Sequence, residues 1–365
     1  MTNNVIIDNV AFSIQKIGGI SVVWYETISR LLKDSRYDVE FVECEDAVSN
    51  YYRKLLEMGK RKIFPISRRF FLLTRYVNPK LGILHPYIFH SSYYRISRDK
   101  KAINFTTVHD FGYERSGSKS LRTRIHVWQQ KQAVMKSDVV ICISENTKKD
   151  LLHYYKDVNP EKVHVIYNAV SEEYSLLPSF EGIELPFERG KYMIYVGVRR
   201  EYKNYDLVLE ALAGTDYKLV IVGNPLTEGE IAVLDEKLGD GNYCCLSKIA
   251  NKRLNELYNG AFALMYLSSY EGFGIPCIEA QKAGCPVIAY NGSSIPEVVD
   301  NKDLLVDELK VEAIRDKLKK LEDKSYRENT VESGLRFVKR FSWDESYRQL
   351  TTLYDRELEK ARMNG

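Results

Sequence analysis

Short apolar segments alternate with longer amphipathic segments along almost the whole chain. Runs such as VIIDNVAF (5–12) and AFALMYLS (261–268) are rich in residues that favour β-strands, and the segments between such runs have helical periodicity. Strict alternation of strands and helices indicates parallel sheets with helices on both faces. The alternation stops once, at 171–190, where prolines and glycines stand without periodicity, and then it restarts. We therefore expect an α/β chain with two Rossmann-like domains.

The alternation predicts the elements of each domain in order. In the first domain the predicted strands are 5–12, 38–43, 86–92, 103–110, 138–144 and 162–168, and the helices are 20–33, 121–136 and 146–155. In the second domain the strands are 191–198, 217–223, 242–247, 261–268, 285–290 and 303–307, and the helices are 204–214, 226–238, 251–260, 275–283, 294–300, 309–322 and 325–340. A last helix is predicted at 343–362, after the second domain. The expected boundaries are 1–170 for the first domain, 171–190 for a linker and 191–340 for the second domain. Functional residues are expected in the loops that follow the strands, because ligands of such sheets bind beyond the carboxyl ends.

Several classes of protein are excluded by simple observations. The 365 residues suit two domains, and 44% hydrophobic with 28% charged residues is ordinary globular usage. No apolar run reaches the ~18 residues that span a bilayer. The start, MTNNVIID, lacks the pattern of a signal peptide, and the six cysteines have no metal-type CxxC spacing. A cytoplasmic protein with reduced thiols is expected.

Charge is distributed unevenly between the two halves. Residues 1–170 hold 27 Lys and Arg against 17 Asp and Glu, whereas residues 171–365 hold 26 against 33. A basic half suggests an anionic partner, such as phospholipid or nucleic acid, and a chance partition of surface charge is the alternative. No motif of a nucleic-acid-binding protein is present, so no nucleic-acid partner is expected.

The basic charge is densest at 53–75, RKLLEMGKRKIFPISRRFFLLTR. This segment has eight Lys and Arg, one acidic residue, and Pro65, which prevents a continuous helix. Basic residues interleaved with large apolar ones suit an anionic membrane surface. The alternative is a solvated face whose apolar side chains pack into the core. The apolar residues concerned are Ile63, Phe64, Ile66, Phe70, Phe71 and Leu72.

The strongest chemical motif is YEGFGIPCIEAQKAGCPVIAY (270–290). It places Glu271 in a glycine-rich loop after a strand and Glu279 in the helix that follows. A helix N-terminus attracts phosphate, and the two carboxylates would accept hydrogen bonds from neutral hydroxyls. A phosphate flanked by two such carboxylates describes a nucleotide-sugar, while the alternative is that both merely complement the helix dipole. The donor-binding candidates here are Glu271, Gly272, Phe273, Gly274, Ile275 and Glu279.

A second motif, VGVRREYKNYDLVLEAL (196–212), follows the first strand of the second domain. Gly197 closes the strand, Arg199, Arg200 and Lys203 can neutralise a diphosphate, and Asn204 can cap the next helix. Lys203 is the strongest candidate, and one arginine is expected to face solvent. A solvated charge cluster is the alternative.

Weaker signals come from three other segments. Gly18-Gly19, between the first predicted strand and helix, could form half a phosphate-binding turn or a simple tight turn. Base recognition is expected near 246–249, with Ser247 and Ile249 as candidates. In TTVHDFGYERS (106–116), strand-end residues could bond a sugar hydroxyl or an acceptor, and a structural histidine is the alternative. The candidates there are His109, Asp110 and Tyr113.

At these motifs the chain resembles GT-B glycosyltransferases of the retaining family 4. The resemblance rests on the E-x7-E pattern of Glu271 and Glu279, on YVGVRREYKN, SDVVICISENTKKDLL and VHVIYNAV, on FSWDESYRQLTTLYDREL (341–358), and on FSIQKIGGISVVWYE, which resembles surface-polysaccharide enzymes of the family. The chain departs from many relatives that have an arginine directly after the glycine or beside the lysine, since Val198 and Tyr202 stand at those positions. Arg199 or Arg200 is left open as the substitute.

The resemblance implies a nucleoside-diphosphate sugar as donor, bound mainly by the second domain, and a glycan or lipid-linked acceptor, bound mainly by the first. It implies that 341–365 is a helix crossing back to the first domain. Retaining transfer would need no obligatory metal, with catalytic roles for Glu271, His109, Lys203 and Arg199. Glu271 would contact the sugar and Glu279 the ribose, so Glu271→Gln should leave binding of the bare diphosphate nearly intact.

Two other functions remain open on the sequence. One is another GT-B enzyme, such as a nucleotide-sugar epimerase, and the other is a non-catalytic sugar-nucleotide-binding subunit. An epimerase would act on the donor alone, whereas a binding subunit would transfer nothing.

Overall fold

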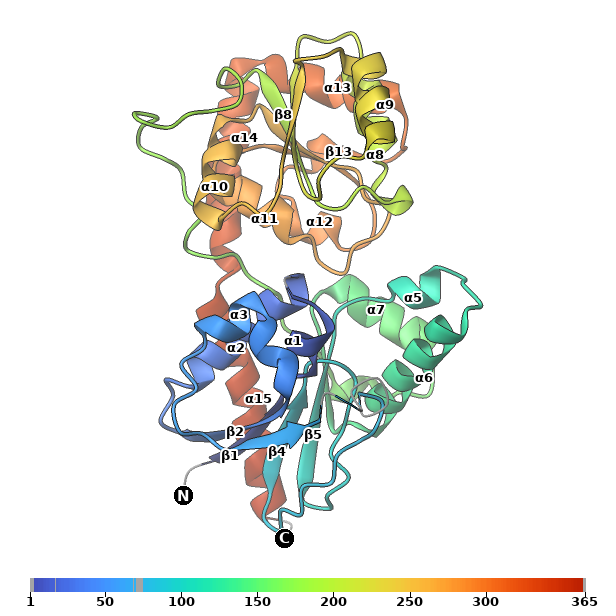
Figure 1. Ribbon diagram of the computed structural model, residues 1–365, viewed down its shortest axis with the longest axis vertical. Helices are drawn as coiled ribbons and strands as arrows, with labels where there is room; N and C mark the ends of the chain where they lie inside the picture. The colour runs from blue at the N-terminus through green and yellow to red at the C-terminus, as the bar shows by residue number, and fades with distance from the viewer. Residues whose placement is uncertain (1–2, 17, 68, 70–74, 364–365) are drawn as a thin grey trace. The chain divides into compact units, whose positions relative to one another are not determined.

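The computed structural model describes residues 3–16, 18–67, 69 and 75–363, and it divides the chain into two compact units (Figure 1). The first unit joins residues 1–168 with 343–365, and the second consists of 169–342. The segment expected to be a linker, 171–190, has no helix or strand but packs on the second unit. The backbone N–H of Ser175 donates to Asn255 Oδ1 at 3.0 Å, and Tyr174 is 2% exposed.

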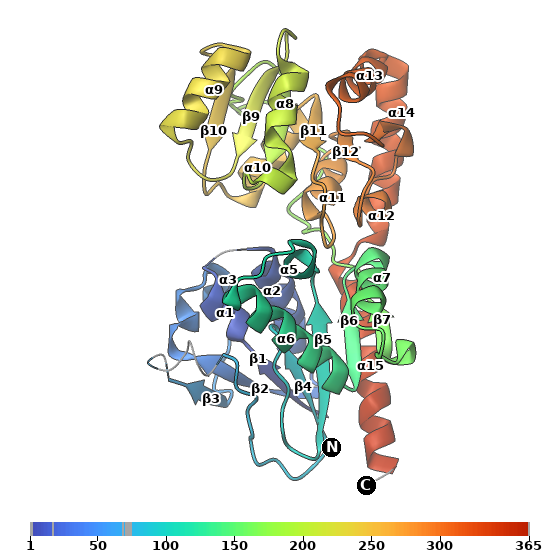
Figure 2. The same cartoon turned by 90° about the vertical axis from the view of Figure 1, so that its right-hand side faces the viewer.

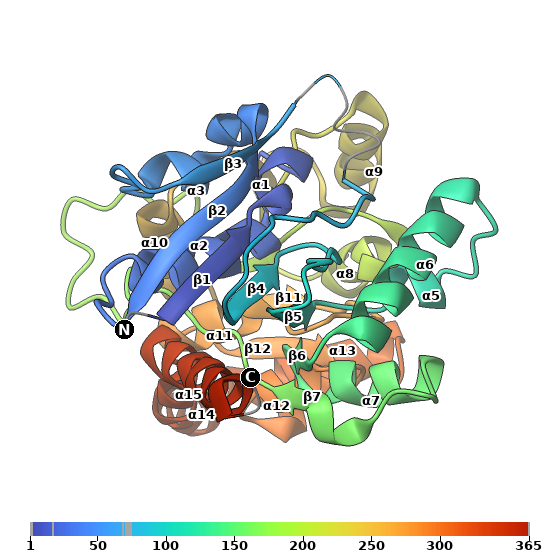
Figure 3. The same cartoon turned by 90° about the horizontal axis from the view of Figure 1, so that it is seen from below.

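The first unit is built on a seven-stranded parallel sheet in the order β3-β2-β1-β4-β5-β6-β7. Its strands are β1 (Asn3–Asp8), β2 (Tyr37–Cys44), β3 (Ile63–Ile66), β4 (Tyr87–Ser91), β5 (Ala102–Val108), β6 (Val139–Cys142) and β7 (Val163–Val165). Its helices are α1 (Val10–Ile14), α2 (Gly19–Leu31), α3 (Tyr51–Leu55), α5 (Gly112–Arg115), α6 (Leu121–Lys136), α7 (Glu145–Tyr154) and α15 (Trp343–Met363). Figure 3 shows β3, β2, β1 and β4 side by side.

Both faces of this sheet are apolar, as the alternation of β1 illustrates. Val5 and Ile7 belong to the larger core cluster, whereas Ile6 belongs to a smaller cluster on the other face. Burial of this kind stabilises the fold by about 1.5–3 kcal/mol for each large apolar side chain. The larger cluster also takes the apolar faces of α2 and α15 through Trp24, Ile28, Leu31, Leu350, Leu353, Tyr354 and Leu358.

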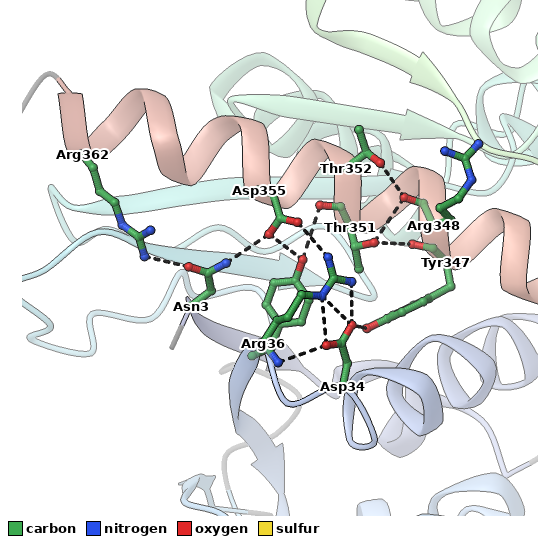
Figure 4. Close-up of polar contacts among 10 residues, drawn as sticks. Asn3, Asp34, Arg36, Tyr347, Arg348, Thr351, Thr352, Asp355 and Arg362 are labelled. Atoms are coloured by element: carbon green, nitrogen blue, oxygen red, sulfur yellow. Dashed lines mark hydrogen bonds and ion pairs between the residues drawn. The ribbon is translucent and has the colours of Figure 1, made fainter. Parts of the chain in front are cut away.

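Polar contacts fix α15 to the N-terminal ends of β1 and β2 in the first unit (Figure 4). Asp355 of α15 accepts hydrogen bonds from the Asn3 amide at 3.1 Å, the Arg36 guanidinium at 3.1 Å and the Tyr37 hydroxyl at 2.7 Å. The last helix is therefore part of the first unit although it follows the second unit in the chain.

The second unit is built on a six-stranded parallel sheet in the order β10-β9-β8-β11-β12-β13 (Figure 2). Its strands are β8 (Tyr192–Val196), β9 (Lys218–Val222), β10 (Tyr243–Leu246), β11 (Ala263–Tyr266), β12 (Val287–Tyr290) and β13 (Leu305–Val306). Its helices are α8 (Tyr205–Leu212), α9 (Glu228–Leu238), α10 (Asn251–Gly260), α11 (Ile275–Lys282), α12 (Ile295–Val298), α13 (Val311–Glu322) and α14 (Lys324–Phe337). The apolar faces of α8 and α13 form one core with the sheet.

The two parallel sheets confirm the predicted fold class, but the first predicted strand is wrong beyond Asp8. Residues Val10–Ile14 form α1 instead, with Val10 and Phe12 buried. Both a buried strand and a buried helix appear as a continuous apolar run, so periodicity alone does not separate them. The short elements α1, α3, α5 and β3, each of five residues or fewer, are also absent from the sequence prediction.

Candidate active site

Two loops at the carboxyl edge of the second sheet carry most of the predicted donor-binding residues, and a third loop supports them. The three loops follow β8, β11 and β12, which are neighbours in the sheet. Asn204, in the first loop, donates through Nδ2 to the carbonyl of Leu267 at 2.6 Å and to Ser269 Oγ at 2.8 Å in the second. The backbone N–H of Ser269 donates to the carbonyl of Tyr202 at 2.8 Å. The predicted side-chain cap by Asn204 is therefore wrong, because this amide joins two loops instead of capping α8.

Lys203 and Glu271 form an ion pair across these two loops. Lys203 is buried, and its Nζ lies 5.2 Å from the ring centroid of Tyr266 and 5.3 Å from that of Tyr202. The structure thus brings together the strongest predicted diphosphate ligand and the predicted sugar ligand, which are 68 residues apart in the sequence.

Two serines hold the Glu271 loop from the third loop. The backbone N–H of Glu271 donates to Ser293 Oγ at 2.9 Å, and Ser294 Oγ donates to the carbonyls of Glu271 at 2.9 Å and Phe273 at 2.8 Å. Ser294 is fully buried. Sequence analysis did not single out these serines, although their position between a predicted strand and a predicted helix was a usable signal.

Backbone strain is concentrated in the same kind of loop. Of the described residues other than glycine, four have a positive φ: Tyr94, Asn204, Lys248 and Ser293. They follow β4, β8, β10 and β12 respectively. Strained conformations of non-glycine residues cluster at functional sites, so the strain independently indicates the carboxyl edges of the two sheets.

The glycine-rich turn leads into the N-terminus of α11. Gly274 has a φ of 108°, and a Cβ there would lie 2.9 Å from Ile295 Cδ1, so both backbone geometry and packing require glycine. Ile275 begins the helix, whose first amides point to the space before it. Gly272 is partly exposed, and Phe273 is 3% exposed and packs edge-on against Phe341. The Phe273 side chain is thus a packing group.

Glu279 lies one turn into α11, against α10. The hydroxyl of Tyr258, which is fully buried, donates to Glu279 Oε2 at 3.3 Å. Burial raises the pKa of Glu279 to about 7, although hydrogen bonds from Tyr174 and Tyr258 act in the opposite direction. Tyr258 and Tyr174 were not predicted, because nothing in their own segments indicates a carboxylate partner.

The two arginines of the basic loop have different surroundings. Arg199 forms an ion pair with Glu230 and donates to the carbonyls of Asn224 and Pro225 at 3.0 Å each. These contacts fasten the loop after β9 and do not bring Arg199 to Lys203. Arg200 is exposed. Gly197, with a φ of 137°, donates its backbone N–H to the carbonyl of Val222 at 2.9 Å.

The weaker donor candidates lie apart from this cluster in the chain. Ser247 and Ile249 flank Lys248 in the loop after β10, and both are partly exposed. Gly18 and Gly19 stand at the N-terminus of α2 in the first unit. They lie at the start of α2, as predicted, and α1 lies between them and β1.

His109 follows β5 in the first unit and is 7% exposed. Its Nε2 atom is buried and accepts or donates no hydrogen bond among the described residues. Burial lowers the pKa of His109 to about 4, so the imidazole is neutral at physiological pH. A neutral ring nitrogen can form one hydrogen bond, as donor or as acceptor according to the tautomer.

Asp110 and Tyr113 surround the same strand end. Asp110 Oδ1 accepts from the backbone N–H of Gly112 at 2.9 Å, which shapes the turn into α5. The ring of Tyr113 lies over that of His126, with centroids 4.0 Å apart. Tyr93 bonds His126 Nδ1 at 3.0 Å, so an aromatic surface from three elements follows β4 and β5. His126 carries no recognisable signal in the sequence.

Comparisons with known proteins agree with this arrangement. A family model described as Glycosyltransferase Family 4 matches residues 17–174, and one described as Glycosyl transferases group 1 matches residues 180–337. The chain is 26% identical over 327 residues to the O-antigen chain mannosyltransferase B of Escherichia coli, covering 85% of this chain and 84% of the relative. It is 30% identical over 182 residues to the O-antigen chain mannosyltransferase RfbU of Salmonella typhimurium, which covers 48% of this chain and 49% of the relative.

Solved structures show the same fold at low sequence identity. Anabaena HepE in complex with UDP and glucose superposes with a TM-score of 0.71 at 13% identity, over 97% of this chain and 99% of that chain. The sucrose-phosphate synthase of Thermosynechococcus elongatus superposes with a TM-score of 0.73 at 16% identity, over 99% and 100% respectively. Because the two family models together match most of the chain and both units have the expected parallel sheets, the protein belongs to the GT-B glycosyltransferases of family 4.

Proposed function

We propose that this glycosyltransferase moves a sugar from a nucleoside-diphosphate sugar to a glycan or lipid-linked acceptor, with retention of configuration, in the assembly of a surface polysaccharide. The observation that carries the proposal is the cluster of Lys203, Glu271 and Glu279 around the N-terminal part of α11. The names of the relatives support a polysaccharide role, since two of them are O-antigen mannosyltransferases. The bound UDP and glucose in Anabaena HepE support the class of donor.

Each part of the donor has a matching group in the second unit. Lys203 and the amides that begin α11 would bind the diphosphate, with the exposed Arg200 as a further cation. Glu279 would accept from the ribose hydroxyls and Glu271 from hydroxyls of the sugar. Cations and oriented amides stabilise the charge of a departing diphosphate, so the proposal includes turnover without a metal ion.

In retaining transfer without an enzyme nucleophile, the acceptor oxygen attacks the anomeric carbon from the face that the diphosphate leaves. The glycosidic bond forms as the carbon–oxygen bond to the diphosphate breaks, and the acceptor proton passes to a phosphate oxygen. His109 would then orient a hydroxyl through its neutral ring, because a buried imidazole with a pKa of about 4 does not act as a cation at pH 7.

The test is incubation of the protein with GDP- and UDP-sugars, with and without lipid-linked and oligosaccharide acceptors. Transfer should appear as a mass increase of the acceptor, and the coupling constant of the new anomeric proton should match that of the donor. Activity should persist in excess EDTA. Conversion of the donor without an acceptor would indicate an epimerase, and binding without any product would indicate a non-catalytic subunit.

The proposal extends to a peripheral position at the cytoplasmic face of a membrane. Within the described residues, no helix is long and apolar enough to cross a bilayer. Part of the segment 53–75 is exposed and basic, including Lys54, Lys60, Lys62 and Arg69. Arg53, however, is 8% exposed and pairs with Glu43, so it cannot contribute to a membrane surface.

The apolar residues of that segment also divide into two groups. Phe64 and Ile66 pack partly on the core through β3, whereas Ile63 is 40% exposed. Phe70, Phe71 and Leu72 lie outside the described residues. Flotation should recover the protein with anionic vesicles and not with neutral ones, and Lys60→Gln/Lys62→Gln should reduce that recovery. Equal recovery with both kinds of vesicle would remove the membrane from the proposal.

A further inference from the structure

The ion pair between Lys203 and Glu271 joins two groups that the proposed function assigns to different parts of the donor. Both side chains are largely removed from water, with exposed fractions of 11% for Lys203 and 16% for Glu271. Within the described part of the chain, Glu271 is the sole hydrogen-bond acceptor that Lys203 Nζ reaches. The other close neighbours of this ammonium group are the rings of Tyr202 and Tyr266.

Separating the pair has a different cost for different ligands. A poorly solvated charge that loses its partner is strongly unfavourable unless another group replaces that partner. A bare nucleoside diphosphate replaces the partner of Lys203 but offers no hydroxyl to Glu271. It also brings negative charge close to the carboxylate of Glu271. The backbone of Glu271 is held in place by hydrogen bonds with the Ser293 and Ser294 hydroxyls. A complete nucleotide-sugar replaces both partners.

From this geometry, and resting on the proposed function, we infer that Glu271 selects the intact donor against the bare nucleoside diphosphate by competing for Lys203. The same competition acts after transfer. Once the sugar has left with the acceptor, Glu271 regains Lys203 and weakens the hold on the diphosphate. Glu271 thereby favours product release in addition to contacting the sugar.

The inference predicts that the bare nucleoside diphosphate binds more tightly when the Glu271 carboxylate is removed, although Glu271 contacts the donor. Glu271→Gln should bind GDP or UDP at least about tenfold more tightly than the unchanged protein, which corresponds to ~1.4 kcal/mol. The ratio of affinities between nucleotide-sugar and nucleoside diphosphate should fall, and inhibition by product should become stronger. A role in loop structure alone would predict weaker binding of every ligand.

The experiment is calorimetric titration of the full chain with GDP, UDP, GDP-mannose and UDP-glucose. Glu201→Gln is the matched control, because Glu201 is exposed and lies two residues before Lys203 in the same loop without an ion pair to it. Glu271→Ala serves as a second variant if the amide forms unintended hydrogen bonds. Lys203→Met should remove the gain when combined with Glu271→Gln, since the gain depends on the freed ammonium group.

The outcomes separate the inference from the function on which it rests. If the unchanged protein binds none of the four nucleotides, the proposed function fails and this inference fails with it. If it binds them but Glu271→Gln binds the bare diphosphate no more tightly, the inference alone is overturned. An equal gain in Glu201→Gln also overturns it, because the effect would then be general electrostatics.

Discussion

Glu279 is a carboxyl group whose pKa the folded protein raises into the physiological range. Its ordinary pKa of 4.5 rises to about 7 because burial disfavours the charged form. A group with a raised pKa binds more protons in the folded state, so its contribution to stability is complete below about pH 4.5. That contribution is lost as the pH rises from about 4.5 to about 7. The residue proposed to bind ribose is thus destabilising at the pH at which it would work.

Replacing Glu279 by glutamine should therefore stabilise the protein at high pH. At pH 8 the free energy of unfolding of Glu279→Gln should exceed that of the unchanged protein by about 1–3 kcal/mol. At pH 4.5 the two should differ much less, because the glutamate is then protonated in the folded state and about half protonated in the unfolded state. Urea denaturation at the two pH values measures the difference. A gap that does not change with pH would show that desolvation of Glu279 is not the cause.

Tyr258 should act on nucleotide binding through Glu279. Tyr258→Phe removes the hydrogen bond from the Tyr258 hydroxyl to Glu279 Oε2, and such a bond contributes ~0.5–1.5 kcal/mol. Binding of the preferred nucleoside diphosphate should weaken roughly twofold to tenfold, and binding of its 2′-deoxy analogue should weaken less.

Tyr192→Phe is the matched control for that change. Tyr192 is also fully buried in the second unit, but its hydroxyl donates to the carbonyl of Leu257 at 2.7 Å. It should lower stability without altering the affinity for nucleotides. Equal losses of affinity in both variants would assign the Tyr258 effect to packing.

At the scale of elements, sequence patterns located the long amphipathic helices well. The predicted ranges 121–136 and 251–260 are those of α6 and α10. Ser120 caps α6 by accepting from the N–H of Thr123, which is a local signal that sequence contains. The edge strand β3 was missed because it is short, contains Pro65 and is partly exposed, although Ile63, Phe64 and Ile66 favour strands.

The candidate site was predictable only in part, and for a related reason. The positions of Glu271, Glu279 and Lys203 after strands follow from local patterns. Local patterns do not show which of these groups contact one another, because the Lys203–Glu271 pair and the Arg199–Glu230 pair depend on how separate segments pack. The Lys203–Glu271 pair also changes the expectation for Glu271→Gln. The sequence predicted little effect on binding of the bare diphosphate, whereas the pair predicts tighter binding.

Arg199 should behave as a structural residue of the loop after β9. Arg199→Met removes the ion pair with Glu230 and two hydrogen bonds to carbonyls, one of them at 3.0 Å to Asn224. We expect a loss of about 1–3 kcal/mol in the free energy of unfolding and proteolysis within 223–227. Arg200→Met, in contrast, should leave stability unchanged and weaken diphosphate binding. Thermal melting measures the stability of both variants, and calorimetric titration measures their diphosphate binding. A loss of stability in Arg200→Met together with weaker binding alone in Arg199→Met would contradict these assignments.

At the scale of the whole molecule, each unit has a core cluster of its own. A ligand that binds one folded unit stabilises that unit by ~2.7 kcal/mol at a concentration of 100 times its Kd. A saturating nucleoside diphosphate should therefore raise the melting temperature of the second unit and leave that of the first unchanged in scanning calorimetry of the full chain.

Tyr354→Phe should have the converse effect. The Tyr354 hydroxyl bonds His90 Nδ1 at 2.5 Å in the core of the first unit, and its loss leaves a buried ring nitrogen unpaired at a cost of about 1–3 kcal/mol. Only the melting temperature of the first unit, which the nucleotide does not change, should be lowered. A common shift of both transitions would mean that the units unfold together.

The place of α15 has a consequence for how the protein is made. The ribosome produces all of 169–342 before it produces the helix that completes the first unit. While the chain is still being synthesised, the second unit can therefore reach its native structure first, although its residues emerge later than most of the first. Until α15 is synthesised, the apolar surface of the first unit that packs against Leu350, Leu353 and Tyr354 stays exposed. During that interval this surface is available to chaperones, so biogenesis and not the finished fold is the stage at which the first unit is most exposed to aggregation.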